Sequence, residues 1–440
     1  MRSRFLFLVA LVTLFAFPLL AATHVVVFSG TPPADFQSRV VALGGSVVFV
    51  HADAGVASVE GLSDSAAAAL EKSSGIRIVE PDQEFTIAPA SLDSAELAEV
   101  EPNSAADPTS AYFYARQWHL RQIGAPAAWA AGKLGSPAVT VAVLDTGIAY
   151  TCPDLQGRVD LSRSVSFQPG DDAVVAALFP GLDPITDLYF HGTHVSATIS
   201  SNGLVGAGVT SGVTLMGVKV LNYQGSGSTT STVRGILWAA DHGADVINMS
   251  LGGGFAKNGA GRLVAYLNQA TNYAYRKGAL VVVSAGNSAW DLDHDGNTYI
   301  SYCNAPNVVC VSATGPLNYS LAGPWVAPDT PADYTNYGRS AISVAAPGGF
   351  GSYVYEACSN TSLAIPVCQT GNYILGASGT SMAAPHVSGL AALIVGEIGH
   401  GNPARVRARL LQSADDLGQP GTDPFYGKGR INVPRALGLE

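Results

Sequence analysis

Short apolar runs alternate with amphipathic segments along most of the chain after residue 117. Five runs are continuous enough to be strands buried on both faces, at 139–145, 213–221, 244–250, 280–286 and 308–314. Segments with helical spacing lie between and after them, at 192–200, 228–243, 261–278 and 380–399. This alternation predicts an α/β fold with a doubly wound, mostly parallel sheet and helices on both faces. In such sheets, function gathers at the carboxyl ends of the strands.

A smaller α/β pattern precedes this region, over residues 23–87. Its strand-like segments lie at 24–28, 46–50, 55–61 and 76–82, and its helical segments lie at 33–44 and 63–75. About 65 residues is a marginal size for an independent domain, so we expect this unit to need a partner surface. Residues 88–112 are rich in Ala, Ser, Glu and Pro, and their lack of periodicity predicts a linker.

The first 22 residues have the order of a secretory signal peptide. Arg2 and Arg4 precede an apolar stretch over 5–20, which Ala21 and Ala22 follow. About 16 apolar residues is short for a membrane span, although an uncleaved anchor is the alternative. We therefore expect a secreted protein, extracellular or periplasmic, with no membrane attachment once the signal is removed.

Composition and charge exclude two further classes. Hydrophobic residues make up 48% of the chain and charged residues 13%, which is the opposite of a disordered composition. The formal net charge is −10 and no long basic run is present, so the chain lacks the electrostatic footprint of a nucleic-acid binder. We expect a globular, acidic monomer.

The chain has five cysteines, and export makes disulfides possible. Proximity in sequence suggests Cys303–Cys310 and Cys358–Cys368 as pairs, although sequence alone does not fix connectivity. Cys152 is then left over, as a half-buried free thiol.

Three polar residues stand at the points where function is expected in this fold. Asp145 ends the apolar run VTVAVLD, His191 opens HGTHVSATIS, and Ser381 lies in GTSMAAPHVSG at the start of a helical segment. Taken singly, the aspartate and the serine are more often helix caps, and the histidine is more often structural. Each signal is therefore weak by itself.

Together these residues supply the parts of a nucleophilic site. A serine hydroxyl needs a neighbouring base, which a histidine can provide near neutral pH, and a buried carboxylate can fix the imidazole tautomer. Asn287, after the run LVVVSAG, can donate to an oxyanion. A second donor is the backbone N–H of Ser381 at a helix N-terminus.

The motifs DTG, HGTHV, SAGN and GTSMAAPHVSG, in this order, resemble those of the subtilisin-like (subtilase) serine peptidases. The resemblance covers residues 117–437. It implies that Asp145 orients the histidine, His191 acts as base and then acid, Ser381 is the nucleophile and Asn287 polarises the carbonyl. It implies no cofactor for the chemistry. One departure is Ser196–Ala197, where the family usually has Ala–Gly.

The resemblance also implies where an extended peptide substrate would pair with the enzyme. Glycines there let two backbones approach closely, although plain turn glycines are the alternative. The positions implied on the two edges and the S1 wall are Gly225, Ser226, Gly227, Ser250, Leu251, Gly252, Ala285 and Gly286. None of them indicates a charge preference, so we expect broad, apolar-leaning cleavage of proteins or peptides.

The N-terminal unit over 23–87 resembles the inhibitory propeptide common in this family. An exported peptidase needs its cleft blocked until export, so the unit would act as an intramolecular inhibitor. The catalytic domain would then be 113–440, with self-cleavage in the linker 88–112.

Two sets of residues suggest structural calcium. Asp291, Asp293 and Asp295 have the opening spacing of an EF-hand loop, but position twelve is Tyr302, so a surface calcium loop and a plain acidic turn are both open. By resemblance, three further residues occupy the place of a calcium site in subtilisins. These are Gln117, Asp154 and Asn202.

Two other functions compete with peptide hydrolysis. A secreted, non-catalytic binding protein on the same scaffold would require a decayed triad or oxyanion donor, and all four positions are intact. An α/β-hydrolase esterase would use a G-x-S-x-G elbow and the order Ser, Asp, His, whereas the order here is Asp, His, Ser. Secreted serine endopeptidase is the interpretation that fits best.

Overall fold

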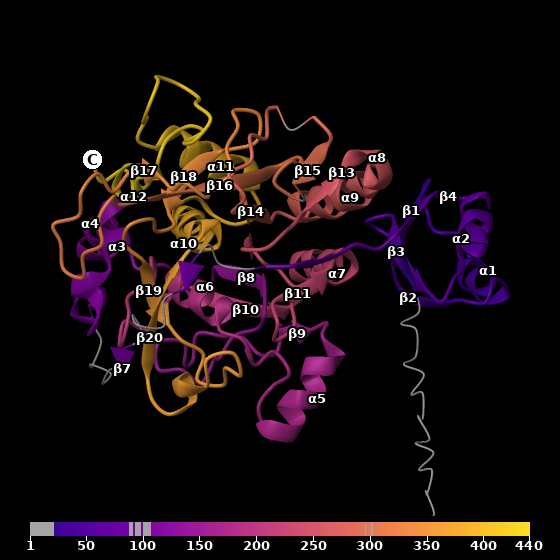
Figure 1. The fold of residues 1–440 in the computed structure, drawn as a ribbon, viewed down its shortest axis with the longest axis horizontal. Helices are drawn as coiled ribbons and strands as arrows, with labels where there is room; N and C mark the ends of the chain where they lie inside the picture. The colour runs from indigo at the N-terminus through magenta and orange to yellow at the C-terminus, as the bar shows by residue number, and fades with distance from the viewer. Residues whose placement is uncertain (1–21, 88–90, 93–97, 100–106, 295, 301) are drawn as a thin grey trace, which may run out of the picture.

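The computed structural model describes residues 22–87, 91–92, 98–99, 107–294, 296–300 and 302–440 (Figure 1). The expected signal peptide, except Ala22, lies outside the described residues, as do parts of the expected linker.

The centre of the fold is an eight-stranded sheet with the order β17-β16-β14-β12-β8-β10-β9, in which β18 also pairs with β16. Every pair in it is parallel except β16 with β17. The fold class expected from the apolar runs is therefore correct. The strands are β8 (Thr140–Asp145), β9 (Val165–Ser166), β10 (Thr214–Lys219), β12 (Val246–Met249), β14 (Leu280–Ser284), β16 (Val308–Gly315), β17 (Thr330–Pro331) and β18 (Val344–Pro347).

Alternate residues of each central strand enter two separate hydrophobic cores. Val141 and Val143 of β8 pack in one core with helices α6 (His191–Ile199), α10 (Thr380–Ile398) and α11 (Pro403–Gln412). Ala142 and Leu144 pack in the other with α7 (Thr229–Asp241) and α9 (Leu263–Arg276). Burial on both faces is why these strands are apolar throughout. α10 is long and apolar enough for a membrane span, but 83% of its apolar window is buried inside the fold, so it is a core helix.

The N-terminal unit, residues 22–87, contains a four-stranded sheet with the order β2-β3-β1-β4. One face forms a small core with α1 and α2, to which Val26 contributes, while Val25 and Val27 face the core around α7 and α9. The unit thus shares a hydrophobic interface with the rest of the chain, as its marginal size predicts. Its elements are β1 (Thr23–Phe28), α1 (Phe36–Ala42), β2 (Ser46–His51), β3 (Val56–Glu60), α2 (Asp64–Glu71) and β4 (Ile76–Pro81).

The last residues of this unit and the segment that follows it pair with two strands of the larger part of the chain, β11 and β20. β5 (Glu84–Thr86) pairs antiparallel with β11 (Ser226–Ser228), and the trace leads from the N-terminal unit toward the middle of the molecule (Figure 1). The short strands β6 (Ser91–Leu92) and β7 (Ala98–Glu99) both pair with β20 (Tyr373–Ser378), whose other neighbour is β19 (Val354–Ala357). Parts of the expected linker are therefore strands.

Other elements were not expected from the sequence. The ten-residue helix α5 projects from the sheet beside β9 (Figure 1). It is anchored by a buried ion pair in which Lys219 Nζ lies 2.9 Å from Asp171 Oδ2. The remaining elements are α3 (Trp118–Gln122), α4 (Ala125–Ala130), α5 (Pro169–Leu178), α8 (Lys257–Ala260), α12 (Val433–Leu437), β13 (Gly254–Ala256) and β15 (Thr298–Ile300), with 3-10 turns at Pro108–Ser110, Tyr114–Arg116 and Pro366–Gln369.

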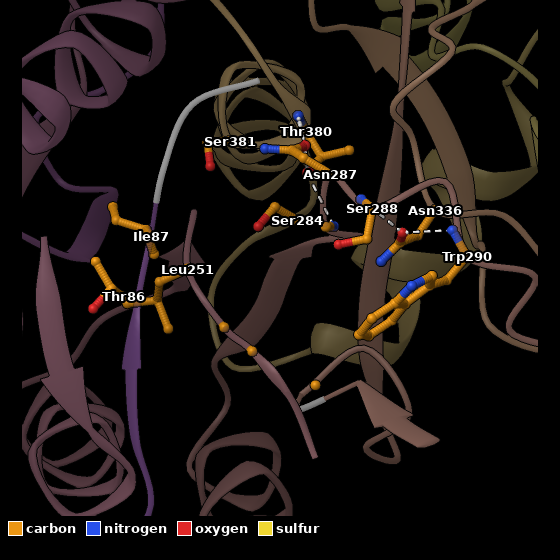
Figure 2. Close-up of a pocket in the computed structure, with 14 residues that line it drawn as sticks. Thr86, Ile87, Leu251, Ser284, Asn287, Ser288, Trp290, Asn336, Thr380 and Ser381 are labelled. Carbon is orange, nitrogen blue, oxygen red and sulfur yellow. Dashed lines mark hydrogen bonds between the residues drawn. The ribbon is translucent and has the colours of Figure 1, made fainter. Parts of the chain in front are cut away.

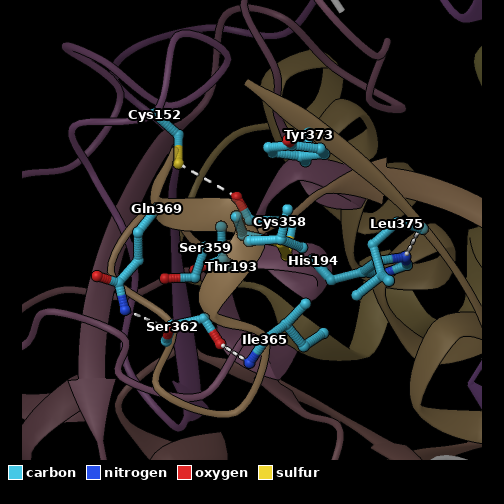
Figure 3. Close-up of a disulfide and its surroundings, with 12 residues drawn as sticks. Cys152, Thr193, His194, Cys358, Ser359, Ser362, Ile365, Gln369, Tyr373 and Leu375 are labelled. Atoms are coloured by element: carbon cyan, nitrogen blue, oxygen red, sulfur yellow. Dashed lines mark hydrogen bonds between the residues drawn. A yellow bond between two sulfur atoms is a disulfide. The ribbon is translucent and has the colours of Figure 1, made fainter. Parts of the chain in front are cut away.

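Both disulfides suggested by sequence proximity are present, Cys303–Cys310 and Cys358–Cys368. Cys152 is a free thiol and is fully buried rather than half-buried. Figure 3 shows its sulfur directed at the backbone of Cys358. Its Sγ donates to the backbone carbonyl of Cys358 at 3.5 Å. Burial raises the pKa of this thiol to about 12.

Candidate active site

Asp145 and His191 meet at the carboxyl end of β8. The carboxylate of Asp145 ends that strand, and His191 is the first residue of α6, so both are held by regular elements. His191 Nδ1 lies 2.8 Å from Asp145 Oδ1, and both side chains are fully buried. Such a bond holds one imidazole tautomer, with the proton on Nδ1 and Nε2 available as a base.

Glycines explain how the two loops approach so closely. A Cβ on Gly192 would lie 2.1 Å from the carbonyl oxygen of Gly147. Gly147 itself has φ +111°, and a Cβ there would lie 2.3 Å from the carbonyl oxygen of Ile185. The glycines of DTG and HGTH are therefore required by backbone contact rather than by flexibility.

A second buried carboxylate, Asp187, joins the same two loops. Its Oδ1 accepts the hydroxyl of Thr146 at 2.9 Å, and its Oδ2 accepts the hydroxyl of Thr193 at 2.6 Å. Backbone N–H groups of Tyr189 and Thr193 donate to it as well. Burial raises the pKa of the Asp187 carboxyl, and the hydrogen bonds offset part of that rise. Asp187 thus links the residue after Asp145 to α6.

Ser381 is the second residue of α10, and its hydroxyl is hydrogen-bonded to a backbone carbonyl rather than to the histidine. Its Oγ donates to the carbonyl oxygen of Ser250 at 3.1 Å, and Ser250 Oγ donates back to the Ser381 carbonyl at 2.8 Å. His191 Nε2 is buried without a hydrogen-bond partner among the described residues. The structure brings the aspartate and histidine together, but the hydrogen bond between His191 and Ser381 is not formed in this state.

The side chain of Asn287 is oriented by the residue before Ser381. Thr380 donates to Asn287 Oδ1 twice, from its backbone N–H at 2.9 Å and from its hydroxyl at 2.8 Å (Figure 2). The same hydroxyl accepts the backbone N–H of Gly286 at 3.0 Å. With Oδ1 tied to the N-terminus of α10, Nδ2 is the end of the Asn287 amide that can donate to a ligand.

A cavity of about 300 Å³ opens beside Ser381 (Figure 2). Among the described residues that line it, none carries a charged side chain. Leu251, Gly252 and Gly286 are among the wall residues that sequence implied. Ser250 and Ala285 were implied as wall residues too, but they are buried and do not line the cavity. The Ser250 hydroxyl instead donates to the Ser381 carbonyl. The lining is completed by Gly253, Gly254, Ser284, Asn287, Ser288, Trp290, Asn336 and Thr380, together with Thr86 and Ile87 of the N-terminal segment.

The substrate-binding edge implied at Gly225, Ser226 and Gly227 is paired with the end of the N-terminal unit. Residues 226–228 oppose residues 86–84 in antiparallel register. The backbone N–H of Ile87 then donates to the carbonyl of Gly225 at 2.9 Å. This edge therefore binds an extended backbone that leads to the cavity containing Ser381 (Figure 2).

The residues suggested for a subtilisin-type calcium site do not fit a cation here. Both carboxylate oxygens of Asp154 accept backbone N–H groups, from residues 204, 205 and 206. Gln117 Oε1 accepts the N–H of Ala207, and Asn202 Oδ1 accepts the guanidinium of Arg158 at 2.7 Å. Calcium requires free oxygen ligands, whereas each of these oxygens faces a donor.

The carboxylates of the acidic loop at 291–297 likewise accept hydrogen bonds from protein donors. Asp291 Oδ2 lies 2.7 Å from His294 Nδ1, and Asp293 accepts backbone N–H groups of Arg339 and Ser340. Asp295 lies outside the described residues. The Asp293 carboxylate therefore ties this loop to residues 339–340, while the Asp291 carboxylate bonds within the loop. A plain acidic turn fits these two carboxylates better than a calcium loop.

Sequence reasoning missed three residues that shape this site. Thr380 had a signal, because it stands inside the GTS motif next to Ser381. Asp187 and Asn336 had none, because their contacts with residues 146, 193 and 285–290 arise only when the sheet brings separate loops together.

Comparison with known proteins gives a consistent result. A model described as the subtilase family matches residues 136–429. Thermitase of Thermoactinomyces vulgaris is 33% identical over 338 residues, which cover 75% of this chain and 99% of thermitase. Subtilisin Savinase of Lederbergia lenta is 34% identical over 322 residues, which cover 72% of this chain and 97% of the relative.

Solved structures show the same similarity in three dimensions. Fervidolysin from Fervidobacterium pennivorans, a keratinolytic enzyme related to subtilisin, matches with a TM-score of 0.69 at 25% identity. The match covers 95% of this chain and 61% of the fervidolysin chain. The epidermin leader peptide processing serine protease of Staphylococcus aureus has a TM-score of 0.69 at 21% identity and covers 96% of this chain and 98% of its own, which shows the shared fold.

Proposed function

The chain belongs to the subtilase family and is a serine endopeptidase, and on that premise we propose that it is exported as a self-inhibited precursor. In this proposal Asp145, His191 and Ser381 form the triad, and Asn287 is the side-chain oxyanion donor. The catalytic part rests above all on the 2.8 Å hydrogen bond between buried Asp145 and His191, beside a cavity that Ser381 and Asn287 line.

The proposed reaction begins with rotation of the Ser381 hydroxyl from the Ser250 carbonyl toward His191 Nε2. Ser381 Oγ then attacks the substrate carbonyl carbon while Nε2 accepts the hydroxyl proton. Asp145 holds the imidazole and stabilises the imidazolium. Collapse of the tetrahedral intermediate breaks the C–N bond, and the histidine gives its proton to the leaving amine. Water repeats the sequence on the acyl-enzyme and frees Ser381.

Charge on the substrate oxygen is met by two donors in this proposal. Asn287 Nδ2 is one, oriented by the two Thr380 bonds to Oδ1, and the backbone N–H of Ser381 is the other. Ser381 stands at the N-terminus of a 19-residue helix, where the helix dipole also favours negative charge. Loss of one such donor costs subtilisin itself roughly 100- to 1000-fold in kcat, a value taken from that relative.

For specificity, we propose broad cleavage with an apolar preference at P1. The cavity beside Ser381 has no charged lining among the described residues, so a charged P1 side chain would meet no countercharge there. The backbone pairing at β11 adds affinity with little demand on side chains. Profiling on a peptide library tests this, and strict dibasic cleavage would overturn it.

We propose that residues 23–87 are the inhibitory propeptide. Support comes from β5, which takes up the β11 edge where a substrate would pair, and from Ile87, which lines the same cavity as Ser381. Polar contacts also hold the unit: Asp82 accepts the N–H of Thr230 at the start of α7, and Arg262 Nε lies 3.1 Å from Glu80 Oε1.

Self-cleavage would fall between residues 87 and 91, within the linker 88–112. The chain pairs with Gly225 up to Ile87, and from Ser91 it pairs with β20 opposite Ser378. β20 leads directly into Gly379 and Ser381, so these two pairings bracket the nucleophile. We therefore propose that the bond to be cut lies between these two pairings.

Export is supported by the N-terminal sequence and by two disulfides, which persist in oxidising compartments. We therefore propose an extracellular or periplasmic location. We propose no calcium at the two candidate sites, because the described oxygens there accept N–H donors or pair with imidazole.

Conversion of Ser381 to Ala in the full chain tests the proposal. We expect the precursor to accumulate after signal removal, with no cleavage of casein and no labelling by a sulfonyl fluoride. Ser196→Ala is the matched control, because the buried Ser196 hydroxyl has no hydrogen-bond partner among the described residues, and this variant should mature normally. A Ser381→Ala variant that matures in pure form would show that processing needs another protease.

A further inference from the structure

The side chain of Asn336 holds the loop that carries Asn287. Asn336 is 2% exposed and its amide makes three hydrogen bonds to that loop (Figure 2). Nδ2 donates to the Ala285 carbonyl at 2.8 Å, while Oδ1 accepts the N–H of Ser288 at 3.1 Å and that of Trp290 at 2.9 Å. One amide therefore bonds to the backbone on both sides of Asn287.

The backbone of the two segments is joined as well. The N–H of Asn336 donates to the carbonyl of Gly286 at 3.0 Å. Gly286 has φ +99°, and a Cβ there would lie 2.5 Å from Asn336 Nδ2. The glycine before Asn287 is therefore required by the presence of this asparagine, and the two segments are in direct contact.

Asn287 thus has two separate anchors. Thr380 holds the end of its side chain through Oδ1, and Asn336 holds the backbone from which that side chain projects. An oxyanion donor is effective only when it is fixed at hydrogen-bond distance from the developing charge before the reaction begins. Displacement of the backbone at Asn287 moves Nδ2, even while Thr380 keeps its own bonds.

We propose that Asn336 is a positioning residue for the oxyanion donor, acting through the backbone of residues 285–290. The proposal rests on the function proposed above for Asn287. It predicts a loss of transition-state stabilisation, and therefore a fall in kcat, rather than a loss of substrate binding.

Two variants separate the bonds of this amide. Asn336→Leu is nearly isosteric and removes all three, and we expect kcat to fall about 10- to 100-fold with KM changed less than about threefold. Asn336→Asp keeps an acceptor for Ser288 and Trp290 but loses the donor to Ala285, so we expect a smaller fall, about 3- to 10-fold. Asn432→Leu is the control, because Asn432 is a buried helix cap of α12 outside the cavity; it should lower stability without lowering kcat.

The decisive measurement is a double-mutant cycle with Asn287→Ala, using full-length expressed enzyme normalised by active-site titration. If Asn336 acts through Asn287, the double variant has the same kcat as Asn287→Ala alone, and Asn336→Leu weakens a peptide aldehyde inhibitor in proportion to its loss of kcat. Additive losses, or a change confined to KM or to the melting temperature, would overturn the proposal. An Asn287→Ala variant with full kcat would instead refute the function proposed for Asn287. Should Asn336→Leu not fold, Asn336→Asp carries the same cycle.

Discussion

Gly227 and Phe85 oppose each other across the antiparallel pair of β11 and β5. The pairing joins an edge of the enzyme to its own N-terminal segment. A Cβ at Gly227 would lie 2.6 Å from Leu221 Cδ2 and 2.7 Å from the Val220 carbonyl. A side chain at this position would therefore displace the strand on which an extended peptide pairs.

Gly227→Val should weaken binding of long peptides selectively. Loss of one or two backbone hydrogen bonds, each about 1 kcal/mol, raises KM about 5- to 30-fold for substrates that extend four residues before the cut. A short ester substrate does not reach β11 and should keep its KM. Gly170→Val is the control, because a Cβ at Gly170 meets nothing within 4 Å. Equal effects on long and short substrates would contradict this account of the edge.

Asp187→Asn should impair catalysis although Asp187 is not a triad residue. An asparagine oxygen can replace one carboxylate oxygen but not both, so the link from Thr146 to Thr193 is broken on one side. We expect kcat to fall about 10- to 100-fold, from roughly 1–3 kcal/mol of lost positioning. Steady-state kinetics with Asp160→Asn as a surface control check this; unchanged kcat would show that Asp187 serves stability alone.

Acid should destabilise the fold through buried histidines. Burial lowers the pKa of His386 to about 4 and that of His194 to about 3, each from 6.5. Because the folded state disfavours the imidazolium, the stability that these groups confer is complete above about pH 6.5 and is lost as pH falls toward their folded pKa values. For His386 the loss is about 3 kcal/mol.

Urea unfolding of the full-length Ser381→Ala protein between pH 4 and 7 measures this effect without self-digestion. The double variant with His386→Gln should lose less stability over that interval than its parent, because one of the titrating rings is gone. Parallel curves for the two proteins would remove His386 as a cause of acid lability.

Cys152 should be unreactive in the folded protein. With its pKa raised to about 12, its thiolate fraction at pH 8 is about one in 10,000, and burial also denies access to reagents. Native protein treated with iodoacetamide should remain unmodified by mass spectrometry. Denaturation without reductant should expose one thiol, and denaturation with reductant should expose five. Rapid modification of native protein would show that the loop around Cys152 opens.

The sequence predicted the central strands and long helices well, because burial on both faces leaves runs such as 139–145 and 280–286 almost wholly apolar. It did not predict α5 or β20, because the formation of these two elements depends on contacts with distant residues rather than on their own hydrophobic pattern. Asp187 and Asn336 were invisible for the same reason. The suggested calcium ligands had suitable residue types, but sequence does not show whether an oxygen faces a cation or a backbone N–H.

The strands β5, β6 and β7 have a consequence for how fast the enzyme would become active. On the proposed cut, the N-terminal fragment becomes a separate molecule, so dilution favours its departure from α7 and α9. The segment with β6 and β7 remains part of the mature chain, and its local concentration at the β20 edge is independent of dilution. The two segments would therefore leave the active site with different kinetics. Rebinding of the cleaved N-terminal fragment is bimolecular and depends on protein concentration, whereas rebinding of the segment with β6 and β7 is intramolecular and does not.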